Sequence, residues 1–371
     1  LETTADGPIE LVSLAGTVTI NKGNDADDTG VSAGSGGHVY IEALGDSSDL
    51  IYNADIKSSG GRIDLSAEND VDGNADISSA NGEVTIEAGS ATVDGVPVDG
   101  VNLADGTLVD SGNGDVEIVA GNLSDVWLNL IRAGVGTVTV TAERDIRDNN
   151  DFDVNVEAET VNLVIDSPDG VAGQVGATGL GHIDTAVTHL NTDSSSANGD
   201  QWIYELDGLA SLDINAGDGS VALISGGTVN DSDGDPDIQA TTVWASIVGD
   251  FGAMGDGNSI DTAVMNLNVA TSFTIPGGNQ WIDEADGLST LNLDAGDGYI
   301  QLHAGAAIED NEPSVDIIAD GVDVFALTGI GTMAPISTFV KTISLEAANG
   351  DIDVDNLRDD PVTATLLKTG V

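Results

Sequence analysis

Residues 61–89 read GRIDLSAENDVDGNADISSANGEVTIEAG and contain one short pattern twice, starting at Gly61 and again at Gly82. In each copy a glycine is followed by apolar residues at every second position, as at Ile63 and Leu65. A period of two is the period of a β-strand that buries one face. The stretch therefore predicts two half-buried strands, one repeat apart.

The same pattern recurs along the chain, often directly after an Asn-Gly or Asp-Gly pair. Such pairs accept positive φ and allow a sharp turn. They could equally close two-residue hairpins. The first copies, however, are separated by about the length of one solenoid coil, with one strand motif in each interval. This spacing favours a solenoid. The copies begin at Gly16, Gly37, Gly61, Gly82, Gly114, Gly136, Gly219, Gly298 and Gly350.

A longer repeat overlies the short one in the second half of the chain. The segment GDQWIYELDGLASLDINAGDG from Gly199 matches GNQWIDEADGLSTLNLDAGDG from Gly278, and we call this the long repeat. We therefore expect two zones: residues 1–125, with coils of about 21–24 residues, and residues 126–371, built of supercoil repeats of about 80 residues. Stacked coils would form parallel ladders with Val, Ile and Leu inside, so the predicted fold class is all-β, a parallel β-helix or β-solenoid.

Residues 61–89 and the run NGDVEIVAGN at 113–122 resemble the filamentous haemagglutinin-type repeats of large, repetitive secreted bacterial adhesins. The resemblance implies a right-handed parallel β-helix that forms a single elongated rod. It also implies an extracellular or cell-surface location and a structural role.

Charge and composition exclude several classes of partner. The chain has 64 acidic and 9 basic side chains, so its formal net charge is −55. Nucleic acids and anionic membrane surfaces are bound through clustered Lys and Arg, which this chain lacks. No stretch approaches the roughly 18 apolar residues of a membrane span, so we expect no membrane insertion. The absence of cysteine excludes disulfide scaffolds and thiolate metal sites.

The acidic turns are candidate calcium sites. Around Gly234, carboxylates alternate along the chain, an arrangement similar to the oxygen-rich loops that bind Ca²⁺. The alternative is that these residues cap turns and stay hydrated. We predict structural Ca²⁺, with candidate ligands Asp231, Asp233, Asp235 and Asp237; Asp148, Asp151 and Asp153; Asp310, Glu312 and Asp316; Asp70, Asp72 and Asp76; and Asp25, Asp27 and Asp28.

Two tryptophans recur in register, Trp202 and Trp281, each in the motif Gly-(Asp/Asn)-Gln-Trp-Ile. Their faces could stack on sugar rings, although covering a coil corner is the commoner use of so large a side chain. The four histidines lack the spacing of a zinc site. We find no convincing Ser-His-Asp arrangement and no phosphate-binding loop, and the repeats stay regular, so we expect no enzymatic activity.

These observations predict an extracellular structural protein, either a segment of a large adhesin or a protomer of a self-assembling surface filament. Its expected partners are copies of itself or continuing coils, because the edge of a coil exposes backbone hydrogen-bonding groups. Surface glycans or extracellular matrix are further possible partners. Two alternatives stay open: a carbohydrate-binding or polysaccharide-degrading β-helix, and tandem β-sandwich modules linked by Ca²⁺.

Overall fold

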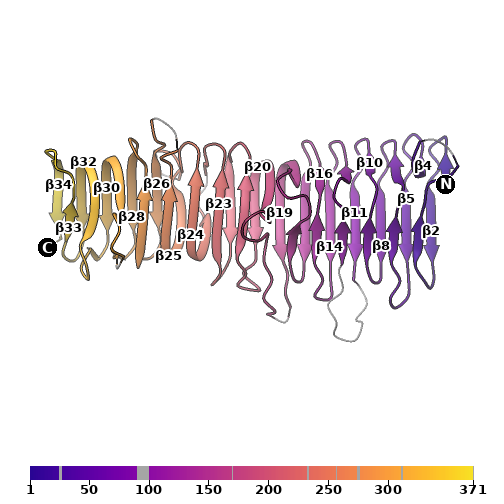
Figure 1. Cartoon of the computed structure of the whole chain (residues 1–371), viewed down its shortest axis with the longest axis horizontal. Helices are drawn as coiled ribbons and strands as arrows, with labels where there is room; N and C mark the ends of the chain where they lie inside the picture. Colours follow the sequence, from indigo (N-terminus) through magenta and orange to yellow (C-terminus); the bar gives the residue numbers. More distant parts are fainter. Residues whose placement is uncertain are drawn as a thin grey trace. The chain divides into compact units, whose positions relative to one another are not determined.

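The computed structural model describes residues 1–24, 27–89, 100–168, 170–231, 234–255, 257–273, 276–310 and 312–370. Within these ranges the chain consists of strands and turns, with no helix. It divides into two compact units, Leu1–Ile203 and Tyr204–Val371. Within each unit, neighbouring strands pair in parallel as the coils of a β-solenoid (Figure 1), which confirms the predicted fold class. Parallel pairing is the pattern of a solenoid, whereas β-sandwich modules are antiparallel.

In the first unit, each coil contributes one strand to each of three parallel ladders. The first ladder contains β2 (Ile9–Ser13), β5 (Val39–Ala43), β8 (Ile63–Ala67), β11 (Val84–Ala88), β14 (Val116–Ala120) and β17 (Thr137–Ala142). The second contains β1 (Glu2–Thr3), β4 (Thr29–Ala33), β7 (Asp55–Ser58), β10 (Ile77–Ser79), β13 (Leu108–Asp110) and β16 (Leu130–Arg132). The third contains β3 (Val18–Ile20), β6 (Leu50–Tyr52), β9 (Val71–Gly73), β12 (Val101–Leu103), β15 (Val126–Leu128) and β18 (Ile146–Asp148).

Longer strands close this unit. The first part of β19 (Val156–Ile165) pairs with β16 and its second part pairs with β17, so β19 continues two ladders at once. The strand β20 (Ile183–Asp193) then pairs with β19 along most of its length. The next strand, β21 (Gln201–Glu205), contains the point at which the chain passes from the first unit to the second.

Alternating apolar residues fill the interior of the coils. Ile41, Leu65, Ile86, Ile118 and Val140 are partners in register on neighbouring strands, and each is almost completely buried. On each strand, the residues directly before and after this buried position point outward. Because every coil presents an apolar side chain at the same position, the ladders form one continuous column of core contacts.

The recurring glycines are required by close approach of neighbouring coils. A Cβ atom on Gly114 would lie 2.5 Å from the carbonyl oxygen of Gly82, and one on Gly136 would meet the carbonyl oxygen of Gly114. Gly61 and Gly82 are in the same position relative to the preceding coil. At these four positions the glycine that opens the strand motif is therefore a packing requirement of the stack, whereas a Cβ atom on Gly16, in the first copy, would meet no atom within 4 Å.

In the second unit, long strands pair with two shorter ones each. The strand β24 pairs with β22 through its first residues and with β23 through its last, and β30 pairs with β27 and β28 in the same way. The strands are β22 (Ser211–Asn215), β23 (Ser220–Ser225), β24 (Ile238–Ile247), β25 (Ile260–Ala270), β26 (Gln280–Glu284), β27 (Thr290–Asp294), β28 (Tyr299–Ala304), β29 (Ala307–Ile308), β30 (Ile317–Ala326), β31 (Gly329–Ile330), β32 (Ile336–Ala347), β33 (Val354–Asn356) and β34 (Thr363–Thr369).

Coil length varies along the stack. In the first ladder, Ile63 is the register partner of Val84, and Val84 is the register partner of Val116, so the second of these coils is clearly longer than the first. In the second unit, Val322 pairs with Ile343, a step as short as the one from Ile63 to Val84. The predicted division into zones 1–125 and 126–371 concerns the grouping of such coils into supercoils, and it stays a prediction.

Candidate functional site

The acidic turn before β30 contains two buried carboxyl groups. Asp310 follows β29 and Asp316 precedes β30, and their side chains are only 2 % and 1 % exposed. Oδ2 of Asp316 accepts a hydrogen bond from the Ser337 N–H at 2.6 Å, whereas its Oδ1 is buried without a hydrogen-bond partner among the described residues. Oδ2 of Asp310 accepts from the Glu312 N–H at 2.6 Å.

These two carboxyl groups contact each other, and Asp310 opposes the ionisation of Asp316. Burial is the main cause that raises the pKa of Asp316 to about 6, and the negative charge of Asp310 adds to the rise. The hydrogen bond from Ser337 acts in the opposite direction, because it stabilises the carboxylate. The pair is therefore a place where either a proton or a cation is favoured.

The turn before β24 repeats this arrangement one supercoil earlier. Asp231 and Asp237 are 3 % and 1 % exposed, and their carboxyl groups are in contact. Oδ2 of Asp237 accepts from the Asp261 N–H at 2.6 Å, the equivalent of the Ser337 bond. Burial raises the pKa of Asp237 to about 8, and the charges of Asp231 and Asp261 contribute.

The corresponding turn in the first unit contains an amide in place of one acid. Asn155 donates from Nδ2 to Oδ1 of Asp148 at 2.8 Å, and its own Oδ1 accepts from the Asp184 N–H at 2.8 Å. Burial raises the pKa of Asp184 to about 7, helped by the charges of Asp148 and Asp153. Here the amide supplies the hydrogen-bond donor that a second carboxylate lacks.

The remaining predicted ligands of these three turns lie outside the buried pairs. Asp151 and Asp153 are exposed, and so are Asp235 and Glu312. Asp233 lies outside the described residues. The sequence analysis missed Asp184, Asp261 and Asn155 as members of the turns. The repeated run Ile-Asp-Thr-Ala-Val, at 183–187 and 260–264, was the signal that marked the two aspartates as equivalent.

The acidic residues predicted in the first zone separate in the structure. Asp70 accepts a hydrogen bond from the Gly100 N–H at 3.1 Å, and Asp72 lies on β9 with Ile51 and Asn102 as its register partners.

Asp28 and Asp76 instead line one groove, together with Asp55 and Asp105. Asp28 also forms an exposed ion pair with Lys22 at 2.8 Å. Asp27 is exposed, and Asp25 lies outside the described residues.

In the ranges that the structure describes, no cluster of three or more His, Asp or Glu side chains has the geometry of a metal site. Calcium binding therefore stays a prediction for all of these turns.

The two predicted glycan-stacking residues are partly buried. Trp202 lies on β21 and Trp281 on β26, each between buried neighbours on its strand. The indole N–H of Trp281 is buried and has no hydrogen-bond acceptor among the described residues. The register partner of Trp281 on β28 is Gln301, so the next coil does not extend an aromatic column there.

A groove in the second unit brings together residues that the sequence analysis did not single out. Its volume is about 460 Å³, and its walls include Pro236, Asp261, Asp283, His303 and Phe325. Nδ1 of His303 lies 3.0 Å from Oδ1 of Asp283, and the ring of Phe325 meets the imidazole edge-on. The hydrogen bond between Asp283 and His303 lowers the pKa of the carboxyl group and raises the pKa of the imidazole.

This Asp–His pair occurs in only one of the two copies of the long repeat. Tyr204 occupies the position of Asp283 in the preceding copy, and Ile224 occupies that of His303. A departure from an otherwise regular repeat was the sequence signal that could have identified the groove.

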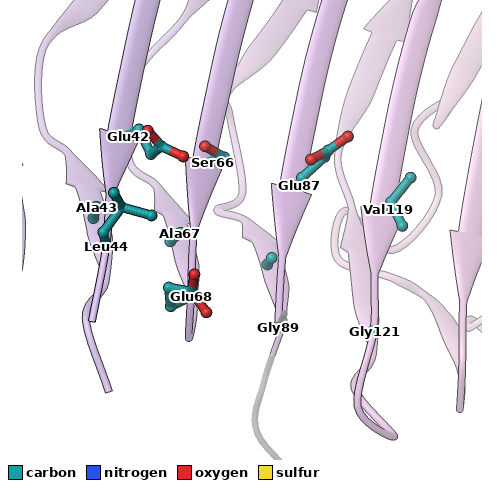
Figure 2. Close-up of a pocket in the computed structure, with 11 residues that line it drawn as sticks. Glu42, Ala43, Leu44, Ser66, Ala67, Glu68, Glu87, Gly89, Val119 and Gly121 are labelled. Atoms are coloured by element: carbon teal, nitrogen blue, oxygen red, sulfur yellow. The ribbon is translucent and has the colours of Figure 1, made fainter. Parts of the chain in front are cut away.

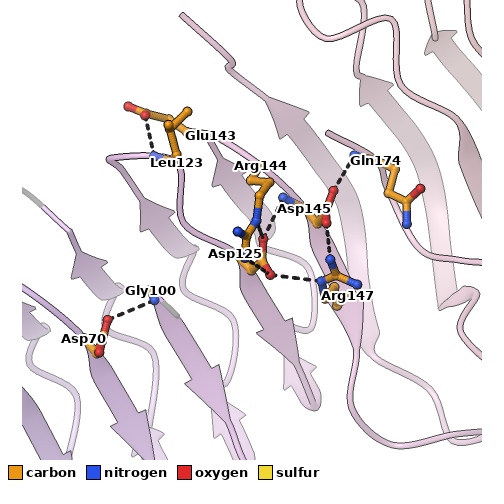
Figure 3. A network of polar contacts seen from close by, with 9 residues as sticks. All are labelled: Asp70, Gly100, Leu123, Asp125, Glu143, Arg144, Asp145, Arg147 and Gln174. Carbon is orange, nitrogen blue, oxygen red and sulfur yellow. Dashed lines mark hydrogen bonds and ion pairs between the residues drawn. The ribbon is translucent and has the colours of Figure 1, made fainter. Parts of the chain in front are cut away.

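Two of the five arginines converge on one buried carboxylate in the first unit (Figure 3). Arg144 binds both oxygens of Asp125, at 2.6 and 2.7 Å, and Arg147 binds Oδ2 at 3.0 Å. Asp125 is 2 % exposed. Arg147 also contacts Asp145 and lies 5.2 Å from the ring centre of Trp127. The network joins successive coils and is structural in character.

A further groove crosses the outer side of the first ladder (Figure 2). Glu42, Ser66, Glu87 and Val119 are register partners on β5, β8, β11 and β14, and they lie along one side of these strands. The volume of this groove is about 320 Å³. The carboxylates give it a negative lining, which suits a cationic rather than an anionic ligand.

The fold and these sites define a parallel β-solenoid protein with acidic turns. Comparison with protein-family models, with curated proteins and with solved structures gave no match. Among the described residues, no helix has the length and apolar character needed to cross a membrane.

Proposed function

We propose that this chain is an extracellular structural β-solenoid, either a segment of a large bacterial adhesin or a protomer of a surface filament, with Ca²⁺ at its acidic turns. The observation that carries the proposal is the stacking itself. Each coil offers its neighbour the same hydrogen-bonding edge and the same apolar column, so stacked coils can extend by adding equivalent units. The similarity of residues 61–89 to adhesin repeats supports the location and the role.

The strand β34 offers one such edge. It pairs with β32, and all seven of its residues are exposed. Because the Gly370 N–H bonds to Ala347 and successive residues of a strand alternate in direction, the N–H of Leu367 points away from β32. The edge of β34 that faces away from β32 can accept a second copy by strand addition.

Electron microscopy of the purified protein tests the filament. We expect fibres of uniform width for the original chain and for Leu367→Ala, which keeps the backbone N–H. Leu367→Pro removes that donor while leaving the β32 side of the strand intact, and we expect it to abolish the fibres. Dispersed particles of the original chain at high concentration, or unchanged fibres of Leu367→Pro, would contradict the filament proposal.

A second candidate function is carbohydrate binding, favoured by the groove at His303. A volume of about 460 Å³ with the ring of Phe325 beside Asp283 and His303 combines an apolar face with hydrogen-bonding groups, as sugar sites do. Calorimetric titration with neutral oligosaccharides tests it. Binding that disappears in both Phe325→Ala and His303→Ile would support this function, and binding lost instead in Trp281→Ala would place the sugar at the tryptophan. No binding by the original chain would refute it.

A further inference from the structure

The turn between β29 and β30 places two buried carboxyl groups in contact. Asp310 and Asp316 are 2 % and 1 % exposed, and Asp310 raises the cost of ionising Asp316. Oδ1 of Asp316 has no hydrogen-bond partner within the described part of the chain. A buried oxygen without a partner costs about 1–3 kcal/mol, and more when it is charged. A ligand bound to this oxygen would remove that cost.

The equivalent turn of the first unit shows which kind of group completes the arrangement. At the position of Asp316 stands Asn155, whose Oδ1 accepts from a backbone N–H in the same way as Oδ2 of Asp316. The Nδ2 group of Asn155 donates to Asp148 at 2.8 Å and to Asn150 at 3.0 Å. The amide thus places positive hydrogen atoms between acceptor oxygens. Asp316 has only a carboxylate oxygen there.

A positively charged ligand would complement the buried carboxylate oxygens of this turn. The chemical type of the ligating atoms indicates which ion it would be. The groups that meet there are the carboxylate oxygens of Asp310 and Asp316. The turn sequence at 309–316, EDNEPSVD, contains neither sulfur nor imidazole nitrogen, which disfavours zinc. Carboxylate, carbonyl and water oxygens in a loop are the ligands of Ca²⁺, whereas Mg²⁺ demands a stricter octahedron and keeps more of its water.

We propose that the pair Asp310–Asp316 binds one Ca²⁺ ion, which takes the place that the Asn155 amide fills in the first unit. This inference rests on the calcium part of the proposed function and names the turn that carries it. The inference does not depend on the filament proposal, because Ca²⁺ binding is measured on dispersed protein.

The test counts bound Ca²⁺ by equilibrium dialysis at neutral pH and follows thermal unfolding with Ca²⁺ or with a chelator. Asp316→Asn, which installs the residue of the first unit, should bind one Ca²⁺ fewer than the original chain. It should also unfold at a higher temperature in chelator, because the amide fills the position permanently. The control Asp351→Asn removes one exposed charge of the same unit and should leave the Ca²⁺ count unchanged.

Two results would overturn the proposal. One is an equal number of bound Ca²⁺ ions in the original chain and in Asp316→Asn, with Asp316→Asn folded by circular dichroism. The other is an original chain that ignores Ca²⁺ and is stabilised by acidification alone, which would assign the position to a shared proton. Fibre formation is scored separately, so failure of this site and failure of the filament proposal are distinguishable.

Discussion

Gly114 lies directly against the carbonyl oxygen of Gly82 in the preceding coil, so close that a Cβ atom would come within 2.5 Å of it. The opposing atom belongs to the backbone and cannot rotate away. Gly114→Ala must therefore separate two coils, and we expect it to lower the free energy of unfolding by about 2–4 kcal/mol. Chemical denaturation monitored by circular dichroism measures the change.

Gly36→Ala is the matched control. A Cβ atom on Gly36 would meet no atom within 4 Å, and its φ is not in the left-handed region. We expect a change of at most about 0.5 kcal/mol. Equal effects of the two substitutions would show that glycine at the start of the strand motif serves chain flexibility and not coil contact.

Asp125 neutralises two arginines inside the first unit. Replacement by Asn removes the charge and leaves Arg144 and Arg147 partly buried opposite a neutral amide. Breaking such a pair on one side costs about 3–5 kcal/mol, so Asp125→Asn should strongly lower the denaturation midpoint. Asp28→Asn, which breaks the exposed pair with Lys22, should leave the denaturation midpoint almost unchanged, because solvent screens that pair. Comparable effects would mean that the buried network contributes no more than a surface ion pair.

The pKa of Asp184, raised to about 7, makes the stability of the first unit depend on pH. The carboxyl group has an ordinary pKa of 3.8, so between about pH 4 and 7 the folded state holds a proton that the unfolded state has lost. This contribution is fully present below about pH 4 and is lost as the pH rises through 7. Asp184→Asn should raise the melting temperature at pH 8 in chelator and change it little at pH 4.

Thermal unfolding of the original chain and of Asp184→Asn across this pH range checks the prediction. The stability difference at pH 8 should be on the order of 2–4 kcal/mol. A difference that does not vary with pH would assign the effect to packing and contradict titration of Asp184.

His303 should titrate above the usual range of a histidine, because Asp283 stabilises its protonated form and so raises its pKa. In Asp283→Asn that charge is absent, so the pKa of His303 should fall. Nuclear magnetic resonance of the imidazole protons follows the titration directly. An unchanged pKa in Asp283→Asn would show that the two side chains do not form the ion pair in solution.

The fold was predictable because its signals are local. Ile63 and Leu65 alternate with residues that point outward, and Gly61 and Gly82 are separated by the length of one coil. The residues of each segment therefore indicate both its strand and its turn. The acidic turns were visible for the same reason: Asp231 and Asp310 fall at one position of the repeat. Local patterns, however, do not state which members of a turn become buried.

The candidate sites depended on the stacking of coils. Asp283 and His303 belong to different strands and meet because β26 and β28 are partners in register. Arg144 reaches Asp125 from the following coil. Because coils of the first unit differ in length, the sequence alone did not fix which turn residues lie above one another.

The sequence by itself thus determined the parallel β-solenoid, through strand alternation and recurring glycine. Only the tertiary structure decided that Asp310 and Asp316 are buried in contact with each other while Glu312, in the same turn, is exposed. The physical reason is that strand formation is set by neighbours along the chain. The environment of a carboxylate is set by the coils stacked on either side of it.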